Sequence, residues 1–335
     1  MQHLRRKCLE DNLPPHLRVA DVLSNETDLP AEITTALVGL GVPPIRQATK
    51  IKQSFHETFM IKFERPVTGL EVGPTSDPTR AVAQVLGAQV GDKGLFSLQA
   101  PISSQGIVCA HQLAREAGVP VPHIWATGTV LRRGPFEKLP FIVCECINTD
   151  TVEDETCAPR EEWNRIVSNQ VQRPLAACVL DDRDAPPLPQ IPDVYAFLAQ
   201  LRGMALDTDD DALCASLGRL EDISRHQCRI TPGPSTLIHQ DLNGGNVLCS
   251  RDQRGWHLDS VIDWESAVVG DSRLALPTEP WSVVRRLGIV VLIRWLWHKA
   301  QTRPQDVPRC SLAELLENHG ESEEVLIRAG WLDGS

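Results

Sequence analysis

The sequence predicts an α+β protein with two lobes, in which a sheet-containing lobe precedes a mostly helical one. The 335 residues exceed the about 100–200 residues of one ordinary domain. The hydrophobic fraction of 42% and the charged fraction of 23% are typical of a folded globular chain, which excludes collagenous and wholly disordered proteins. Strand-like patterns end near residue 147. We therefore expect residues 1–147 to hold an N-terminal extension and the first lobe, and residues 148–335 to form the helical lobe.

Three segments are expected in the first part of the chain. Residues 30–40 predict a short helix, because Pro30 stands at its start and Gly41 follows its end; we interpret this helix as part of an extension. Residues 45–63 predict a hairpin, because β-branched and aromatic residues become frequent and alternate with polar ones. Residues 64–93 contain several prolines and glycines and predict a long loop with one short helix.

The later segments change from mixed to helical patterns. Residues 107–117 have helical spacing and are closed by Gly118. The apolar run Phe141–Ile147 predicts a buried strand that leads out of the first lobe. Residues 150–235 and 280–330 then predict mainly helices, interrupted by acidic loops.

Charge and composition limit the partners of the chain. The formal net charge of −11 repels nucleic-acid phosphates and anionic lipids, so we expect neither a nucleic-acid nor a membrane partner. The most apolar stretch, Leu287–Leu296, contains Arg294 and is far shorter than the about 20 residues of a membrane-spanning helix. The basic N-terminus is not followed by an apolar signal region, and the cysteines follow no zinc or disulfide spacing. A cytoplasmic protein is predicted.

The strongest chemical signal is a pair of segments, Leu237–Leu248 and Ser260–Glu265. Asp241 lies on a short loop after an apolar run and can accept a proton from a substrate hydroxyl. Asn246 offers an amide oxygen five positions later, and Asp263 offers a carboxylate at the end of the next apolar run. Hard oxygen ligands of this kind suit Mg²⁺.

A structural interpretation of these segments is also open. The turn Asn243–Gly245 contains residues that tolerate positive φ, so the chain can double back there. In a plain hairpin, Asp and Asn next to glycine would only cap that turn. This interpretation leaves the spacing His-x-Asp-x-x-x-x-Asn and the later Ile-Asp-Trp-Glu unexplained, and we therefore favour a functional one.

The two motifs, His239–Asn246 and Ile262–Glu265, resemble those of the aminoglycoside phosphotransferase and choline kinase-like families. Those families share the two-lobed protein-kinase-like fold, with a small sheet-containing N-lobe, a mostly helical C-lobe and a cleft between them. The helix that ends at residues 118–122 and the strand at residues 141–147 occur in the order that the families show. The resemblance covers roughly residues 50–280.

The resemblance implies a small-molecule kinase that transfers the γ-phosphoryl group of ATP to a substrate hydroxyl. Asp241 would be the catalytic base, while Asn246 and Asp263 would hold Mg²⁺ against the phosphates of ATP. The carbonyl of Glu145 and the amide of Ile147 would bind the adenine within a nucleotide-binding first lobe. Protein substrates are not expected, because no activation-loop signature is found.

The first lobe departs from the pattern of the families. Residues 52–57, where a loop should cover the phosphates, contain no glycine. The expected third strand, Leu95–Gln99, has no basic residue, and the helix that opens at Ser103 has no glutamate to pair with one. These departures support an alternative, in which a kinase-fold protein without phosphotransfer activity acts as a binding or repurposed module.

A different enzyme class also uses a His-x-Asp sequence. Non-haem iron oxygenases bind Fe(II) through two histidines and one carboxylate, and His239, Asp241 and His298 could supply these ligands. Such enzymes need a jelly roll of many regular strands, whereas this chain predicts long helical regions. The oxygenase interpretation also leaves Asn246 and Asp263 without a role.

Overall fold

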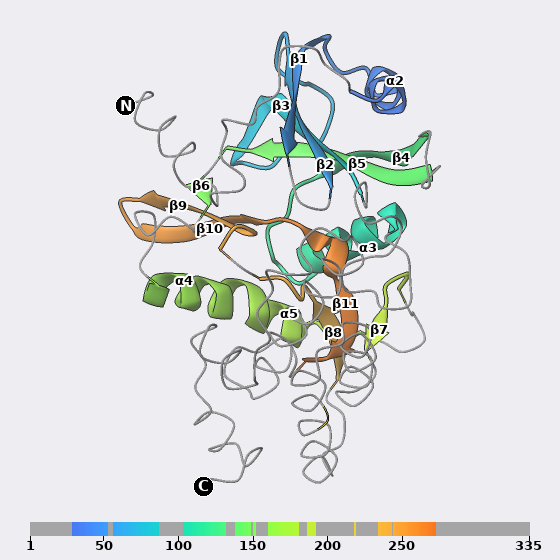
Figure 1. Ribbon diagram of the computed structural model, residues 1–335. Coiled ribbons are helices and arrows are strands. Elements are labelled where there is room, and N and C mark those ends of the chain that lie inside the picture. The colour runs from blue at the N-terminus through green and yellow to red at the C-terminus, as the bar shows by residue number, and fades with distance from the viewer. Residues whose placement is uncertain are drawn as a thin grey trace, which may run out of the picture. The chain divides into compact units, whose positions relative to one another are not determined.

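The computed structural model describes residues 29–52, 56–86, 103–131, 138–148, 150–151, 160–180, 186–191, 218, 234–242 and 244–272. These residues belong to two compact units, whose elements are labelled in Figure 1. The first unit holds the described residues within 1–94, 101–170 and 242–265, and the second holds those within 95–100, 171–241 and 266–335. The predicted division at residue 147 stays a prediction.

A five-stranded antiparallel sheet forms the framework of the first unit, with the strand order β1-β2-β3-β5-β4. Its strands are β1 Ile45–Lys52, β2 Glu57–Phe63, β3 Ser76–Val85, β4 Ile124–Leu131 and β5 Lys138–Ile147. The hairpin predicted at residues 45–63 is confirmed as β1 and β2. The buried strand predicted at residues 141–147 is confirmed within β5.

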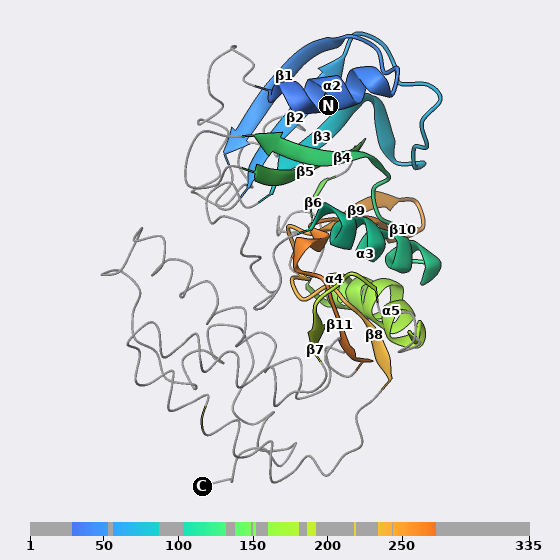
Figure 2. The same cartoon turned by 90° about the vertical axis from the view of Figure 1, so that its right-hand side faces the viewer.

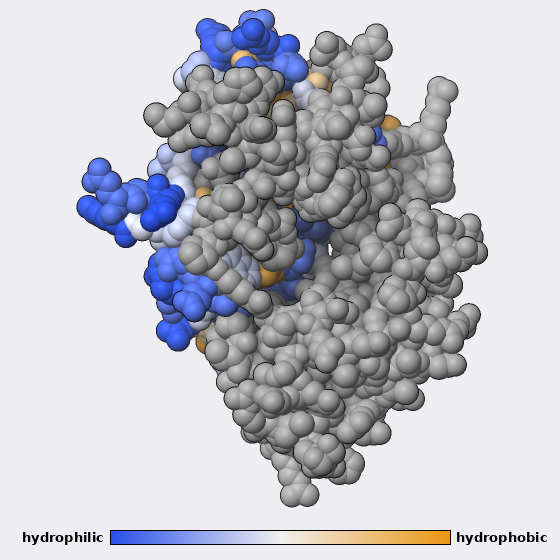
Figure 3. All heavy atoms as spheres, turned by 60° about the vertical axis from the view of Figure 1, so that its left-hand side comes forward, coloured by the Kyte–Doolittle hydropathy of each residue, from blue (hydrophilic) through white to orange (hydrophobic). Residues whose placement is uncertain are grey.

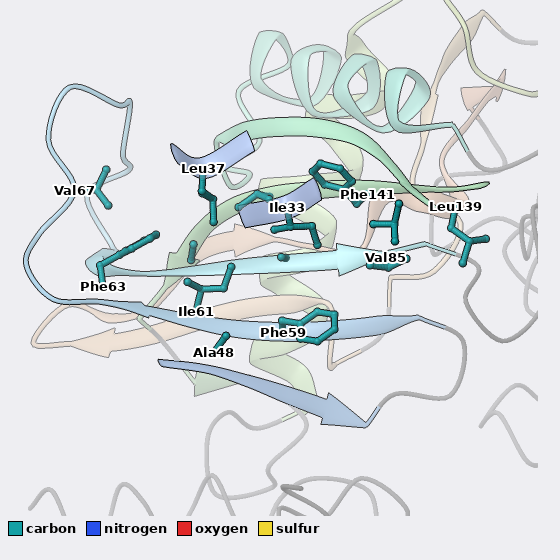
Figure 4. Packing of buried hydrophobic residues seen from close by; sticks show 14 residues of the cluster. Ile33, Leu37, Ala48, Phe59, Ile61, Phe63, Val67, Val85, Leu139 and Phe141 are labelled. Atoms are coloured by element: carbon teal, nitrogen blue, oxygen red, sulfur yellow. The ribbon is translucent and has the colours of Figure 1, made fainter. Parts of the chain in front are cut away.

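Helix α2, Ala31–Gly39, lies across one face of this sheet (Figure 2). Ile33 and Leu37 are fully buried and point from the helix toward the strands, where they join a core that includes Phe59, Ile61 and Phe63 (Figure 4). The predicted helix is therefore confirmed, but its interpretation as part of an extension is wrong. Two apolar side chains one helical turn apart are enough to make it a cover of the sheet.

Strand β3 corrects the prediction of a long loop at residues 64–93. Its last six residues alternate between half-buried and buried side chains, as expected for a strand with one face on a core. Pro78 conceals this pattern, because proline is rare inside strands. Here it lies in a register shift between Asp77 and Ala81, where its carbonyl accepts a bond from the Val67 amide at 2.7 Å. The strand expected at residues 95–99 lies outside the described residues.

Helix α3, Ser104–Glu116, confirms the helix predicted before Gly118. Ser103 is its N-cap, and its hydroxyl accepts a bond from the Gly106 amide. Gly118 has a φ of 82° and donates its amide to the Arg115 carbonyl at 2.9 Å, which ends the helix.

A second sheet of the first unit has the order β10-β9-β6. Its strands are β9 Val247–Asp252, β10 Gly255–Val261 and the short β6 Asp150–Thr151. Helix α4, Arg160–Ile166, continues into a π-helical segment, Val167–Gln172. In that segment the Gln170 side chain accepts a bond from the Leu258 amide of β10 at 3.3 Å.

The second unit contains helix α5, Arg173–Ala177, and a sheet of order β7-β11-β8. Its strands are β7 Gln190–Ile191, β8 Ser235–Ile238 and β11 Val268–Asp271. The two apolar runs that flank the Asp241 loop, β8 and β9, thus belong to different sheets, which excludes the plain hairpin. The helices predicted within residues 150–235 and 280–330 lie mostly outside the described residues, apart from residues 160–177.

Among the described residues, no helix is long and apolar enough to cross a bilayer. The coloured surface in Figure 3 is mostly hydrophilic on the face shown, with isolated hydrophobic spots. The large apolar side chains exposed in the described part are single ones such as Val38, Leu131 and Val179. Isolated exposed apolar residues are ordinary on a globular protein.

Gly128 of β4 lies directly opposite Phe141 of β5, and a Cβ at this position would meet the ring at 2.5 Å. Because Phe141 is only 2% exposed and packed in the core, Gly128→Ala should lower the free energy of unfolding by about 1–3 kcal/mol. Urea denaturation measures this loss. Gly39→Ala in α2 is the control, because a Cβ there meets nothing within 4 Å and should not destabilise the protein. Equal losses for both variants would contradict the packing described here.

Candidate active site

The open end of the β9–β10 ribbon brings two of the predicted metal ligands together. Val247 pairs with Val261, and the Ile262 amide donates to the Asn246 carbonyl at 2.9 Å. Asn246 therefore precedes one strand at the same end at which Asp263 follows the other. The Asn246 side chain is buried, and Asp263 is half-buried.

The backbone is strained at both motifs. Gln240 and Asp263 have φ values of 67° and 68°, and they are the non-glycine residues with positive φ in the part of the chain that the structure describes. The left-handed region is unfavourable for such residues and persists only where the surroundings enforce it. Residues of this kind cluster at functional sites, and here each lies within one of the two motifs. Gln240 lies in the same loop as the turn predicted at Asn243–Gly245, three residues before it. Asn243 is not among the described residues.

Contacts around Trp264 hold the Asp263 backbone in this conformation. Trp264 is 1% exposed, its indole N–H donates to the Val261 carbonyl at 2.9 Å, and its ring meets the edge of His111 from α3. The Val261 amide in turn donates to the Pro120 carbonyl at 2.9 Å. The segment that follows α3 and the end of β10 therefore support each other. Trp264 is therefore a core residue.

Two further side chains lie beside Asp263. His56, at the start of β2, and Glu265, two residues after Asp263, form with it a group whose donor atoms all lie within 4.8 Å of one another. The His56 Nε2 atom is 3.3 Å from a Glu265 carboxylate oxygen, and both side chains are only 5% exposed. The sequence analysis assigned a role to neither residue. Glu265 is part of the recognised motif, whereas His56 is 209 positions away in the chain.

The protonation of His56 follows from its burial. Loss of solvent lowers the pKa of His56 below its ordinary value, and the negative charge of Asp263 opposes this shift only in part. The imidazole is therefore neutral at neutral pH and carries a lone pair on one nitrogen. A neutral imidazole and two carboxylates are a donor set that fits a divalent cation.

Asp241 lies in the second unit, three residues after the end of β8. Its amide donates to the Nδ1 atom of His239 at 3.3 Å, across the left-handed Gln240. His239 is 1% exposed, so a buried ring supports the backbone of Asp241. The Asp241 side chain itself is partly exposed, as a group that receives a proton from a substrate needs to be.

Glu145 and Ile147, the predicted adenine contacts, lie at the end of β5. Ile147 is the last residue of the strand and pairs with Ser76, and the Glu145 amide donates to the His123 carbonyl at 3.1 Å. The sequence analysis attached no role to the side chain of Glu145. In the structure its buried carboxylate accepts bonds from the amide of Gly73 at 2.6 Å, from the amide and ring of His123 at 2.7 and 2.9 Å, and from the Ser76 hydroxyl. This side chain therefore ties three segments of the first unit together.

The sequence analysis looked for a basic residue on a third strand at Leu95–Gln99. In the structure the third strand along the chain is β3, so the basic residue has to be sought there. Its basic residue is Arg80, whose side chain is 44% exposed and forms an ion pair with Asp77 at 3.2 Å. On α3, the buried face consists of Gly106, Ile107, Ala110, His111 and Ala114 and contains no carboxylate. The basic residue and the helix glutamate are thus not paired in the described part of the chain.

The cysteines on either side of Glu145 are packing residues. Cys144 and Cys146 are 8% and 6% exposed. Burial raises the pKa of Cys144 to about 12 and that of Cys146 to about 11. Both thiols are therefore protonated and unreactive at neutral pH.

The sequence matches the model of the phosphotransferase enzyme family, APH, over residues 104–272, which is half of the chain and contains both motifs. The chain belongs to this phosphotransferase family. The family predicted from the two motifs is confirmed. No curated protein matches the sequence significantly.

Solved structures show the same fold as this phosphotransferase-family chain. Spectinomycin phosphotransferase APH(9)-Ia, in complex with ADP and spectinomycin, has a TM-score of 0.52 and 12% identity, with 92% of this chain and all of that chain covered. A mutant aminoglycoside 2′-phosphotransferase IIIa in complex with GDP has a TM-score of 0.50 and 13% identity, with 89% of this chain and 98% of that chain covered. At such identities the likeness shows the fold alone, and it confirms the α+β kinase-like fold.

The iron oxygenase interpretation is wrong for the same reason. Its jelly roll is not the fold of this phosphotransferase-family chain. His298, one of the three ligands that it requires, lies outside the described residues.

Replacement of Glu145 by alanine should destabilise the protein. The change leaves the amide and hydroxyl donors around the buried carboxylate without their acceptor, so Glu145→Ala should lower the free energy of unfolding by about 3 kcal/mol or more. Urea denaturation followed by circular dichroism measures the effect. Glu116→Ala is the control, because that glutamate is exposed and accepts a bond from the exposed Gln112 side chain, so its loss should cost less than about 0.5 kcal/mol. A stable Glu145→Ala protein would contradict the anchoring role.

Proposed function

We propose that this chain is a small-molecule kinase that transfers the γ-phosphoryl group of ATP to a substrate hydroxyl. The observation that carries the proposal is the left-handed Asp263 at the open end of the β9–β10 ribbon, near Asn246 and within a group of buried and half-buried donors that could hold a metal ion. Strain at this residue needs a reason beyond folding, and a metal ligand of a phosphotransferase supplies one. Membership of the phosphotransferase family supports the same reaction class.

Asp241 is proposed to orient the acceptor hydroxyl and to accept its proton. Its backbone is fixed by the buried His239, which keeps the carboxylate in one place while it stays open to a substrate. Asn246 and Asp263 would hold Mg²⁺. When bound, the ion neutralises phosphate charge that develops during transfer. The reaction moves the γ-phosphoryl group from ATP to the acceptor oxygen, ADP leaves, and the hydroxyl proton goes to Asp241.

The nucleotide is proposed to bind at the end of β5, through the carbonyl of Glu145 and the amide of Ile147. The buried Glu145 carboxylate supports this placement, because it fixes the backbone of the strand just where these groups lie. ATP as the donor, a hydroxylated small molecule as the acceptor and a cytoplasmic location belong to the proposal. Two relatives with the same fold are described in complex with ADP or GDP, and one of them with spectinomycin, which is consistent with this substrate class.

A kinase-fold protein without transfer activity is the second candidate. It is favoured by Arg80, the basic residue of β3, which is engaged with Asp77. It is also favoured by the buried face of α3, which carries no carboxylate. An ordinary kinase uses a lysine and glutamate pair at these positions to hold the nucleotide phosphates. A protein of this second kind would bind a ligand and leave it unchanged.

Phosphoryl transfer distinguishes the two candidates. Incubation with ATP and a panel of amino sugars, amino alcohols and other polyols, followed by ³¹P NMR, should reveal a new phosphate ester. With the best acceptor, Asp241→Asn should lower turnover at least about 100-fold, because the proton acceptor is lost. ATP affinity should stay within about threefold of the wild type, because the carboxylate acts on the acceptor.

Asp252→Asn is the matched control for this substitution, because Asp252 caps an exposed turn between β9 and β10 and should leave turnover unchanged. Undiminished turnover in Asp241→Asn would refute the proposed base. A complete panel without any ester, from a protein that binds ATP, would favour the second candidate.

Asp263→Ala should weaken the binding of Mg-nucleotide at least about tenfold, because one charged ligand of the ion is lost. Isothermal titration with the non-hydrolysable analogue AMP-PNP measures the affinity, with Mg²⁺ and again with EDTA. The difference between wild type and variant should vanish in EDTA. If the variant binds the Mg-nucleotide like the wild type, Asp263 is not a ligand.

A further inference from the structure

We propose that His56 is a metal ligand and that His56, Asp263 and Glu265 together bind a divalent transition-metal ion through one nitrogen and two carboxylates. The inference deepens the proposed function, on which it rests for the place of this ion beside the nucleotide phosphates. Asp263 is common to both proposals. His56 and Glu265 are additional ligands. With His56, the donor set changes from oxygen atoms alone to oxygen and nitrogen atoms.

The spacing of the donor atoms fits one shared ion. Donors bonded to an ion at about 2.1 Å lie roughly 3.0–4.2 Å apart in tetrahedral or octahedral geometry. Here the three donor atoms lie within 4.8 Å of one another, and the His56 Nε2 atom is 3.3 Å from the Glu265 oxygen. Small rotations of side chains bring such a group to bonding distance.

The local backbone explains why two carboxylates meet at this point. Asp263 is left-handed after the end of β10, and a short 3₁₀ turn, Trp264–Ser266, follows at once. This turn brings Glu265 back beside Asp263, and the anchored Trp264 between them keeps it there. Two carboxylates that lie close together in a partly desolvated place favour the binding of a cation.

His56 adds a nitrogen donor to this group, because its Nε2 atom lies 3.3 Å from a Glu265 carboxylate oxygen. An imidazole nitrogen can donate a lone pair to a metal, and imidazole ligands suit transition ions, whereas Mg²⁺ prefers oxygen ligands. We therefore expect the site to bind Mn²⁺ more tightly than Mg²⁺ and to lose this preference without His56.

The experiment is a titration of the nucleotide-free full-length protein with Mn²⁺, followed by electron paramagnetic resonance of the free ion. One saturable site is expected in the wild type. His56→Ala should weaken Mn²⁺ binding at least about tenfold, while Mg²⁺ binding, measured by competition, should change less than about threefold. His257→Ala is the matched control, because this histidine of β10 is 44% exposed and bonds Ser250 outside the group; it should bind Mn²⁺ like the wild type.

A second readout needs no variant. Pulsed electron paramagnetic resonance of the Mn²⁺-loaded wild type should detect hyperfine coupling to a histidine nitrogen, and labelling of histidine with ¹⁵N should change it. The proposal is overturned if no nitrogen coupling is found, if no saturable Mn²⁺ site exists, or if His56→Ala binds Mn²⁺ as tightly as the wild type. In the last case His56 would only bond Glu265 and hold the start of β2.

The failure of this inference and the failure of the proposed function give different results. A protein that forms a phosphate ester but shows no nitrogen coupling is a kinase without a His56 ligand. A protein that shows the coupling but forms no ester with any acceptor binds the transition ion without being the proposed kinase.

Discussion

The structure of the candidate site depends on the open end of the β9–β10 ribbon. The bond from the Ile262 amide to the Asn246 carbonyl fixes the last step of the ribbon, and Asp263 then turns into a left-handed conformation. Buried contacts of Trp264 with Val261 and His111 anchor the residue that follows this turn. Asn246, Asp263 and Glu265 take their positions from this end of the ribbon, and His56 reaches the site from the residue before β2.

Local sequence patterns were sufficient for much of the fold. The hairpin of β1 and β2, helix α3 with its glycine stop and the buried strand β5 all follow from alternation, helical spacing or capping, and these signals lie within the elements themselves. Strand β3 was missed because Pro78 and nearby glycines suggested a loop. Only the pairing of β3 with β2 and β5 shows that the proline lies in a register shift. A local sequence pattern does not reveal how a strand pairs with strands that are distant in the chain.

The candidate site likewise contains some residues that the sequence could predict and others that it could not. Asn246 and Asp263 could be predicted because they lie in two short motifs with fixed spacing. His56 could not be predicted, because its contact, Glu265, is 209 positions away and the residues next to His56 do not indicate it. The role of the Glu145 side chain was hidden for a similar reason: its donors, at Gly73, Ser76 and His123, come from separate segments that meet only in the folded sheet. Backbone functions can be expected from a strand end, but buried polar anchors need the tertiary structure.

The central claim is that this chain binds a nucleotide through a divalent ion held at the end of the β9–β10 ribbon. The most direct measurement is the affinity of the wild-type protein for ATP, determined by isothermal titration with excess Mg²⁺ and again after removal of all divalent ions by EDTA. Saturable binding with Mg²⁺ that weakens at least about tenfold without it is the predicted result. Equal affinity under both conditions, or no binding of ATP at all, would contradict the account.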